Sequence, residues 1–189
     1  QGNLWTARSG REVIHLVGTY HLPDPRHNAT LEALAPALQE AKVILVEATP
    51  EEERLLQAEI ARRPEFMVTT DCPLLSEQLT EAEWEKLAAE AELRGIPPFM
   101  ANRFRPWYMA VLLSVPPCAT DTLRDGKRGL DHLIMEQARV PVRALEPFDT
   151  LFSIFGALSA EDETEMVRAT LLTVDRPEDM TVTLANAYF

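Results

Sequence analysis

Two short apolar runs, at residues 13–17 and 43–46, constrain the fold of this chain more than any other feature. Nearly continuous apolar sequence over four or five residues is typical of strands that are covered on both faces. Between them, residues 28–41 carry apolar side chains at helical spacing. A strand, a helix and a strand over this length form a βαβ unit, whose two strands are parallel. The sequence therefore predicts a mostly parallel sheet at the centre of the fold.

Turn and cap residues complete the predicted organisation. Ser9 and Gly10 predict the turn of an amino-terminal β-hairpin, and the pair Thr80 and Glu83 predicts a capped helix start. Pro36 lies inside the first predicted helix, where a proline costs roughly 3 kcal/mol, so we expect a kink or a later start. Further helices are expected at residues 50–63, 81–94, 100–115, 130–139, 148–158, 160–174 and 177–189, and a third short strand at residues 142–145.

This order of elements indicates an α/β chain with many inserted helices, and α+β is the alternative. The length of 189 residues predicts a single domain spanning residues 1–189. Three or four strands are few for so much helix, and residues 187–189 form no polar tail. We therefore expect the domain to lack its carboxyl-terminal part.

Composition excludes several classes of function. The net charge of −12 argues against nucleic-acid binding, which draws much of its affinity from phosphate neutralisation. No apolar stretch is long enough to span a membrane. Cys72 and Cys118 are too few for a disulfide scaffold and lack zinc-ligand spacing, so they form either one bridge or two unpaired thiols. No signal peptide is visible.

Polar residues with useful chemistry follow each predicted strand. The first apolar run is followed by Gly18 and His21, the second by Glu47, and the third strand by Glu146. Ligands of open parallel sheets bind at the carboxyl ends of the strands, so these side chains are expected to face one crevice. His21 can ligate a metal or act as a base, and Glu47 can ligate a cation or orient the histidine. Asp131, at a helix start, can join them.

Each of these residues also has a structural explanation. A histidine after a strand is often a hydrogen-bonded loop residue. Glu47 and Glu146 stand near prolines that begin helices, so both can serve as helix caps. Asp131 lies in a first helical turn, where the helix dipole already favours an acid.

The remaining histidines and one arginine are weaker candidates. His15 lies inside a strand and is expected to be structural, whereas His27 and His132 are expected at the surface. Arg105 can present its guanidinium to an anion, although packing of the neighbouring Trp107 explains most of this motif.

Five motifs in a fixed order point to a known family. Residues 18–23 read GTYHLP, residues 43–47 VILVE, residues 105–107 RPW, residues 129–131 GLD, and residues 142–146 VRALE. Each motif alone is weak, but their order and spacing across nearly the whole chain are fairly specific. The chain resembles the TraB/PrgY/GumN family, which includes the TIKI proteins that cleave Wnt ligands.

The resemblance implies a fold similar to erythromycin esterases and ChaN-like haem-binding proteins. TIKI members are metal-dependent proteases that prefer manganese or cobalt to zinc, and their site combines a GxxH motif with a glutamate after the second strand. The first maps onto Gly18 and His21, and the second onto Glu47. The family's second GxxH motif is missing, because no histidine follows His132. Many bacterial members are exported, which implies a periplasmic or extracellular location.

Together these observations predict a metal-dependent hydrolase, and a peptidase in particular. His21 and Glu47 would hold a divalent ion, with Glu146 as a further catalytic carboxylate. Gly18, Asp131 and Arg105 would support the ligands or face a peptide or small-molecule substrate. One alternative is a non-catalytic module that binds a ligand or peptide on the same fold. Another is a metal-free hydrolase that uses His21 as general acid and base.

Overall fold

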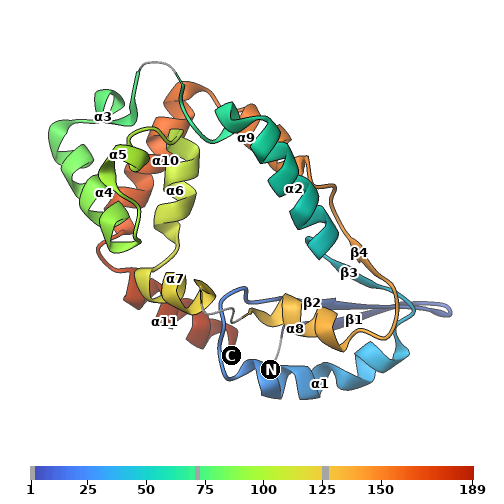
Figure 1. Ribbon diagram of the computed structural model, residues 1–189. Coiled ribbons are helices and arrows are strands. Elements are labelled where there is room, and N and C mark those ends of the chain that lie inside the picture. The colour runs from blue at the N-terminus through green and yellow to red at the C-terminus, as the bar shows by residue number, and fades with distance from the viewer. Residues whose placement is uncertain (1–2, 71–72, 125–127) are drawn as a thin grey trace.

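The computed structural model describes residues 3–70, 73–124 and 128–189 and shows a mixed α/β chain dominated by helices (Figure 1). The strands are β1 (Leu4–Ser9), β2 (Glu12–Val17), β3 (Ile44–Val46) and β4 (Val142–Ala144). The helices are α1 (His27–Glu40), α2 (Pro50–Arg62), η1 (Pro64–Phe66, a 3₁₀ turn), α3 (Leu75–Gln78), α4 (Glu81–Leu93), α5 (Pro98–Ala101), α6 (Pro106–Ser114), α7 (Pro117–Arg124), α8 (Leu130–Gln137), α9 (Thr150–Gly156), α10 (Ala160–Thr173) and α11 (Pro177–Tyr188).

The described strands form two separate two-stranded sheets. β1 pairs antiparallel with β2, as the hairpin prediction requires, and β3 pairs in parallel with β4. A single central sheet with β2 beside β3 is not confirmed. An apolar run indicates a strand but not its partner, because the backbone groups that pair carry no side-chain signal.

The prediction that β2 is covered on both faces is also wrong for the described part of the chain. Val17 packs against the cluster formed by α1 and α8, whereas Ile14 and Leu16 are exposed. The apolar sequence of β2 therefore leaves one apolar face open.

Prolines decide where the predicted helices differ from the observed ones. α1 begins at His27 and runs through Pro36, so a later start is wrong; burial of Leu31 and Leu34 holds the helix together. The single helix predicted over residues 100–115 is two helices, α5 and α6. Arg105 precedes Pro106 and adopts an extended backbone, which a proline imposes on the residue before it.

The core has two parts. The larger cluster joins α4, α5, α6 and α10 through residues such as Leu87, Met109 and Val167. The smaller cluster joins α1 and α8 through Leu31, Leu34, Leu130 and Ile134, with Val17 and Ile44 packed against it. The two strands of the predicted βαβ unit, β2 and β3, therefore meet α8 at the smaller cluster.

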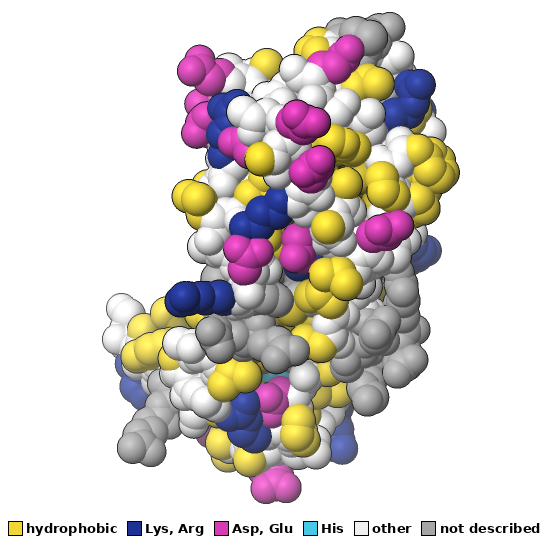
Figure 2. All heavy atoms as spheres, turned by 90° about the vertical axis from the view of Figure 1, so that its left-hand side faces the viewer, with side chains coloured by type: hydrophobic (Ala, Val, Ile, Leu, Met, Phe, Trp, Pro, Cys, Tyr) yellow, Lys and Arg dark blue, Asp and Glu magenta, His cyan; other side chains and the backbone are white. Residues whose placement is uncertain are grey.

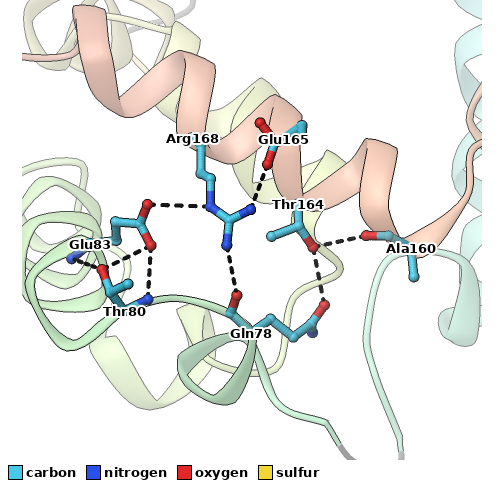
Figure 3. A network of polar contacts seen from close by, with 7 residues as sticks. All are labelled: Gln78, Thr80, Glu83, Ala160, Thr164, Glu165 and Arg168. Carbon is cyan, nitrogen blue, oxygen red and sulfur yellow. Dashed lines mark hydrogen bonds and ion pairs between the residues drawn. The ribbon is translucent and has the colours of Figure 1, made fainter.

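A polar network attaches α10 to the segment that joins α3 and α4 (Figure 3). The Arg168 guanidinium donates to the carboxylate of Glu83 (3.3 Å) and to the backbone carbonyl of Gln78 (3.4 Å). Glu83 also closes the predicted capping box with Thr80. The network thus uses a helix cap as an anchor for the neighbouring helix.

Arg94 ends α4 with a buried cation. Its side chain is 2% exposed and donates to the carbonyl oxygens of Leu113 (3.0 Å) and Val115 (2.8 Å) at the end of α6, and to the carboxylate of Glu90 (2.7 Å). A cation at a helix carboxyl terminus is favourable because the last carbonyls carry partial negative charge. Arg94 therefore joins α4 to α6 inside the larger cluster.

The surface is mixed in character. The face in Figure 2 intersperses apolar side chains with acidic and basic ones. Leu93 and Phe99 are among the exposed apolar residues of the helical part. In the described parts of the chain, none of the helices has the length and apolar character needed to cross a membrane.

Candidate functional site

The GxxH turn, residues 18–21, leaves β2 and is fixed at Gly18 by backbone bonds to two distant segments. Gly18 N donates to the Asn3 carbonyl (2.8 Å), which extends the hairpin, and the Tyr188 hydroxyl of α11 donates to the Gly18 carbonyl (2.7 Å). A Cβ atom on Gly18 would lie 3.3 Å from the Cβ of Asn3, so a larger residue fits only if Asn3 yields. The small residue at this position therefore lets the chain pass close to Asn3.

His21 lies between two carboxylates. Its Nδ1 is 2.6 Å from Oδ2 of Asp131, and its Nε2 is 3.4 Å from Oε2 of Glu47. A carboxylate can only accept, so Nδ1 donates to Asp131, and Nε2 faces Glu47, to which it donates when the ring is protonated; in the neutral ring Nε2 carries the lone pair. The side chains of His21 and Glu47 are 60% and 76% exposed, whereas that of Asp131 is 17% exposed. The Nε2 side of the ring is thus the side that faces solvent.

The start of α8 brings Asp131 to the turn through an unusually close approach of two backbones. Leu130 N donates to the Tyr20 carbonyl (3.1 Å). A Cβ on Gly129 would lie 2.5 Å from the carbonyl carbon of His21 and closer still to its oxygen. The backbone of Gly129 is extended (φ −75°, ψ −179°), so glycine is required here by contact and not by conformation.

The surroundings of His21 and Asp131 favour a protonated imidazole beside an ionised carboxylate. The hydrogen bond to Asp131 raises the pKa of His21 above its ordinary value; partial burial opposes this, and the charges of Asp131 and Glu47 add to it. For Asp131, burial raises the pKa, but hydrogen bonds from His21 and Thr19 outweigh burial and the pKa is lowered. The carboxylate of Asp131 therefore stays ionised behind the imidazole.

Glu47 does not cap a helix. It follows β3 directly, and α2 is capped by Thr49, whose side chain accepts from Glu52 N (3.3 Å). Within the described residues, the contact that the structure shows for Glu47 is its ion pair with His21 and not a cap at α2.

Glu146 and Arg105 are not in contact with His21 in the described structure. Glu146 follows β4 as an exposed residue, and α9 has Asp149 at its cap position, so Glu146 is no helix cap. The Arg105 guanidinium pairs with Glu163, a buried carboxylate of α10, and its Cζ lies over the Phe66 ring, 5.9 Å from the ring centre. The structure thus brings Gly18, His21, Glu47 and Asp131 together, and places Arg105 in the helical part of the chain.

The other histidines differ from expectation at one position. His27 is buried, not at the surface, and its Nε2 donates to the Leu22 carbonyl (2.9 Å), because the turn after β2 folds back over the start of α1. His132 is partly exposed and lies 3.5 Å from Glu53 of α2. His15 bonds to Thr6 across the hairpin, as a structural role requires.

Two supporting residues carry no sequence signal that would have identified them. Tyr188 reaches the turn from a helix 170 residues away in sequence. The sequence shows Gly129 only as a small residue before a predicted helix and does not indicate its close contact with the His21 backbone. Cys118 is exposed, and the other cysteine, Cys72, lies outside the described residues, so the bridge alternative stays open.

In the parts of the chain that the structure describes, no group of three or more histidine, cysteine, aspartate or glutamate side chains has the arrangement of a complete metal site. His21, Glu47 and Asp131 lie close together without forming such a group.

Comparison with known proteins agrees with the order of motifs. No curated protein and no solved structure matches the chain. The profile of the TraB/PrgY/gumN family matches residues 3–189, which is nearly the entire sequence. With the GxxH turn, the strand-end glutamate and the Gly-Leu-Asp helix start meeting in one place, the chain belongs to the TraB/PrgY/gumN family.

Proposed function

We propose that the protein is a metal-dependent hydrolase, and specifically a peptidase of the TIKI/GumN type that acts in the periplasm or outside the cell. The observation that carries the proposal is the orientation of His21. Nδ1 of His21 donates to Asp131, which leaves Nε2 beside the carboxylate of Glu47 on the exposed side of the ring. Histidine ligands of protein metal sites commonly donate their second ring nitrogen to a carboxylate in this way.

The spacing of the two donors fits a divalent ion. Ligands about 2.1 Å from an ion are about 3.0 Å apart at a right angle and about 3.4 Å apart at the tetrahedral angle. The distance from His21 Nε2 to Glu47 Oε2 is 3.4 Å. An imidazole and a carboxylate suit manganese or cobalt, the ions that the family resemblance favours.

Each residue has a defined part in this proposal. His21 and Glu47 would hold the ion, which would supply a water of lowered pKa and polarise the scissile carbonyl. Asp131 fixes the tautomer and the ring orientation of His21 and increases its basicity. Gly129 and Gly18 permit the close backbone packing that places His21. Glu146 remains a proposed substrate-facing carboxylate.

Metal binding tests the proposal directly. We expect Mn²⁺ or Co²⁺ to bind the protein in calorimetric titrations, and His21→Ala or Glu47→Gln to weaken binding at least about tenfold. His132→Ala is the matched control, because His132 also lies 3.5 Å from a glutamate but is not part of the proposed site. The proposal fails if wild type binds neither ion, or if His21→Ala binds as well as wild type.

A second candidate is a hydrolase that needs no metal. The short hydrogen bond between Asp131 and His21 is also the arrangement that orients a general base. Under this alternative, hydrolysis of a peptide or ester would be unaffected by a chelator and abolished by His21→Ala. Loss of activity on chelation, restored by Mn²⁺, would exclude it.

A further inference from the structure

A pocket of about 290 Å³ lies on the other side of the chain segment that carries His21. The segment after β2 forms one wall, and α7 and α11 form the others; Figure 1 shows these two helices beside each other near the start of α1. We refer to it as the α7–α11 pocket. Its apolar lining is contributed by Tyr20, Leu22, Pro23, Ala119, Val182 and Ala185.

The charged groups at this pocket neutralise each other. The Arg26 guanidinium donates twice to the carboxylate of Asp24, at 2.9 Å and 2.7 Å. It also donates to Asn186 (3.1 Å) and lies 4.2 Å from the centre of the Phe189 ring. Both charges are thus engaged within the protein, and a charged ligand would have to break a bidentate pair to use either of them.

The volume limits the size of the occupant. Pockets for drug-sized ligands and cofactors run from roughly 300 to 1,000 Å³, so this pocket is at the small end. It suits one side chain or one ring system, and it is too small for a nucleotide or a haem.

The pocket is next to the candidate site along the chain. The side chain of His21 is directed to Asp131 and Glu47, whereas the residues immediately before and after it, Tyr20 and Leu22, line the pocket. One wall of the pocket is therefore built from the two chain neighbours of His21. An extended peptide that reached His21 would have a side chain within reach of this wall.

We infer that the α7–α11 pocket binds an uncharged apolar or aromatic group, and that it is the subsite for such a side chain of a peptide substrate. The first half stands on the lining and the internal ion pair alone. The second half rests on the proposed peptidase function.

Binding of uncharged amino-acid amides tests whether the α7–α11 pocket takes an apolar group, and this test needs neither a metal nor turnover. N-acetyl-L-tryptophanamide and N-acetyl-L-leucinamide would be titrated into ¹⁵N-labelled protein and followed by amide chemical shifts, with N-acetyl-L-glutamate amide as the charged comparison. Val182 and Leu184 give a matched pair of variants, because both are on α11 and both are 57% exposed, but of the two only Val182 lines the pocket. Val182→Ser removes apolar contact from the pocket, and Leu184→Ser removes as much elsewhere.

We expect saturable shifts for the two uncharged amides, affinity lowered at least about threefold by Val182→Ser, and affinity unchanged in Leu184→Ser. Absence of saturable binding, equal effects of the two serine variants, or equally tight binding of the glutamate amide would each overturn the inference. His21→Ala should leave amide binding intact while removing metal affinity. Failure of the pocket and failure of the metal site are therefore separate results.

Discussion

Replacing Gly129 by alanine puts the closest contact of the candidate site to a direct test. The added Cβ would lie 2.5 Å from the carbonyl carbon of His21 and 2.7 Å from its Cα. Both partners are backbone atoms, so no side chain can rotate away to make room. Either the GxxH turn or the start of α8 must move by several tenths of an ångström or more.

The expected loss of stability follows from two terms. Overpacking of this kind costs typically 1–3 kcal/mol. Separation of the two segments also weakens the hydrogen bond from Leu130 N to the Tyr20 carbonyl, worth about 1 kcal/mol. Gly129→Ala should therefore lower the free energy of unfolding by about 2–4 kcal/mol. With a urea m-value of about 1–3 kcal/mol/M, the unfolding midpoint falls by about 0.7–4 M.

Urea denaturation followed by circular dichroism measures this midpoint, and the imidazole resonances of His21 report whether its bond to Asp131 survives. Gly156→Ala is the control, because nothing lies within 4 Å of the Cβ that it adds. That substitution should be neutral or should stabilise by about 0.4–1 kcal/mol. If Gly129→Ala leaves the midpoint and the His21 resonances unchanged, the close approach of the two backbones is wrong.

Two further predictions concern charged groups. Asp131→Asn removes the anionic acceptor of His21, so the raised pKa of His21 should fall toward its ordinary value in an NMR titration. A histidine whose pKa is raised on folding stabilises the folded state most at pH values below its unfolded-state pKa, near 6.5. This stability is lost as the pH rises through the folded-state pKa of His21. A stability advantage of wild type over Asp131→Asn that increased above that pKa would contradict the assignment. Arg94→Met leaves the carboxylate of Glu90 and three backbone carbonyls without their buried donor and should destabilise the protein by about 3–5 kcal/mol in thermal or urea unfolding. Lys86→Met, which removes an exposed pair with Asp175, should cost at most about 1 kcal/mol, and equal losses in the two variants would refute the role of Arg94.

Sequence reasoning succeeded where the signal is local. The capping box of Thr80 with Glu83 predicted the start of α4, because a helix start depends on side chains within one turn. The positions of His21 and Glu47 after the carboxyl ends of two strands also predicted that their side chains lie close together.

Long-range pairing was beyond the sequence. β2 was expected beside β3, but β3 pairs with β4 nearly 100 residues later, and β2 pairs with β1 alone among the described strands. His21 and Glu47 still meet, because packing of Val17 and Ile44 on the same α1–α8 cluster brings the strand ends together without a shared ladder. The expected proximity of His21 and Glu47 is therefore observed, although it arises by a route that the predicted sheet did not describe.

Burial of single polar residues was equally hidden. His27 looks like a surface residue at a helix start, yet the chain that returns from the turn covers it and gives its ring nitrogen a carbonyl partner. Arg105 looks like an anion-binding residue, yet the buried carboxylate of Glu163 occupies its guanidinium. In both cases the deciding partner is set by tertiary packing.

The hydrogen bonds around Gly18 have a consequence for the order of folding. Asn3 bonds both to Gly18 and to the carbonyl of Tyr188, and the Tyr188 hydroxyl returns to Gly18. These contacts close a loop of some 185 residues, whose entropy must be lost before the bonds can form. The α-helices can form from local contacts as soon as they are synthesised, but the GxxH turn reaches its final geometry only after α11 has docked. The candidate site is thus expected to be among the last parts of the chain to reach its final geometry, and folding intermediates would carry His21 without its fixed surroundings.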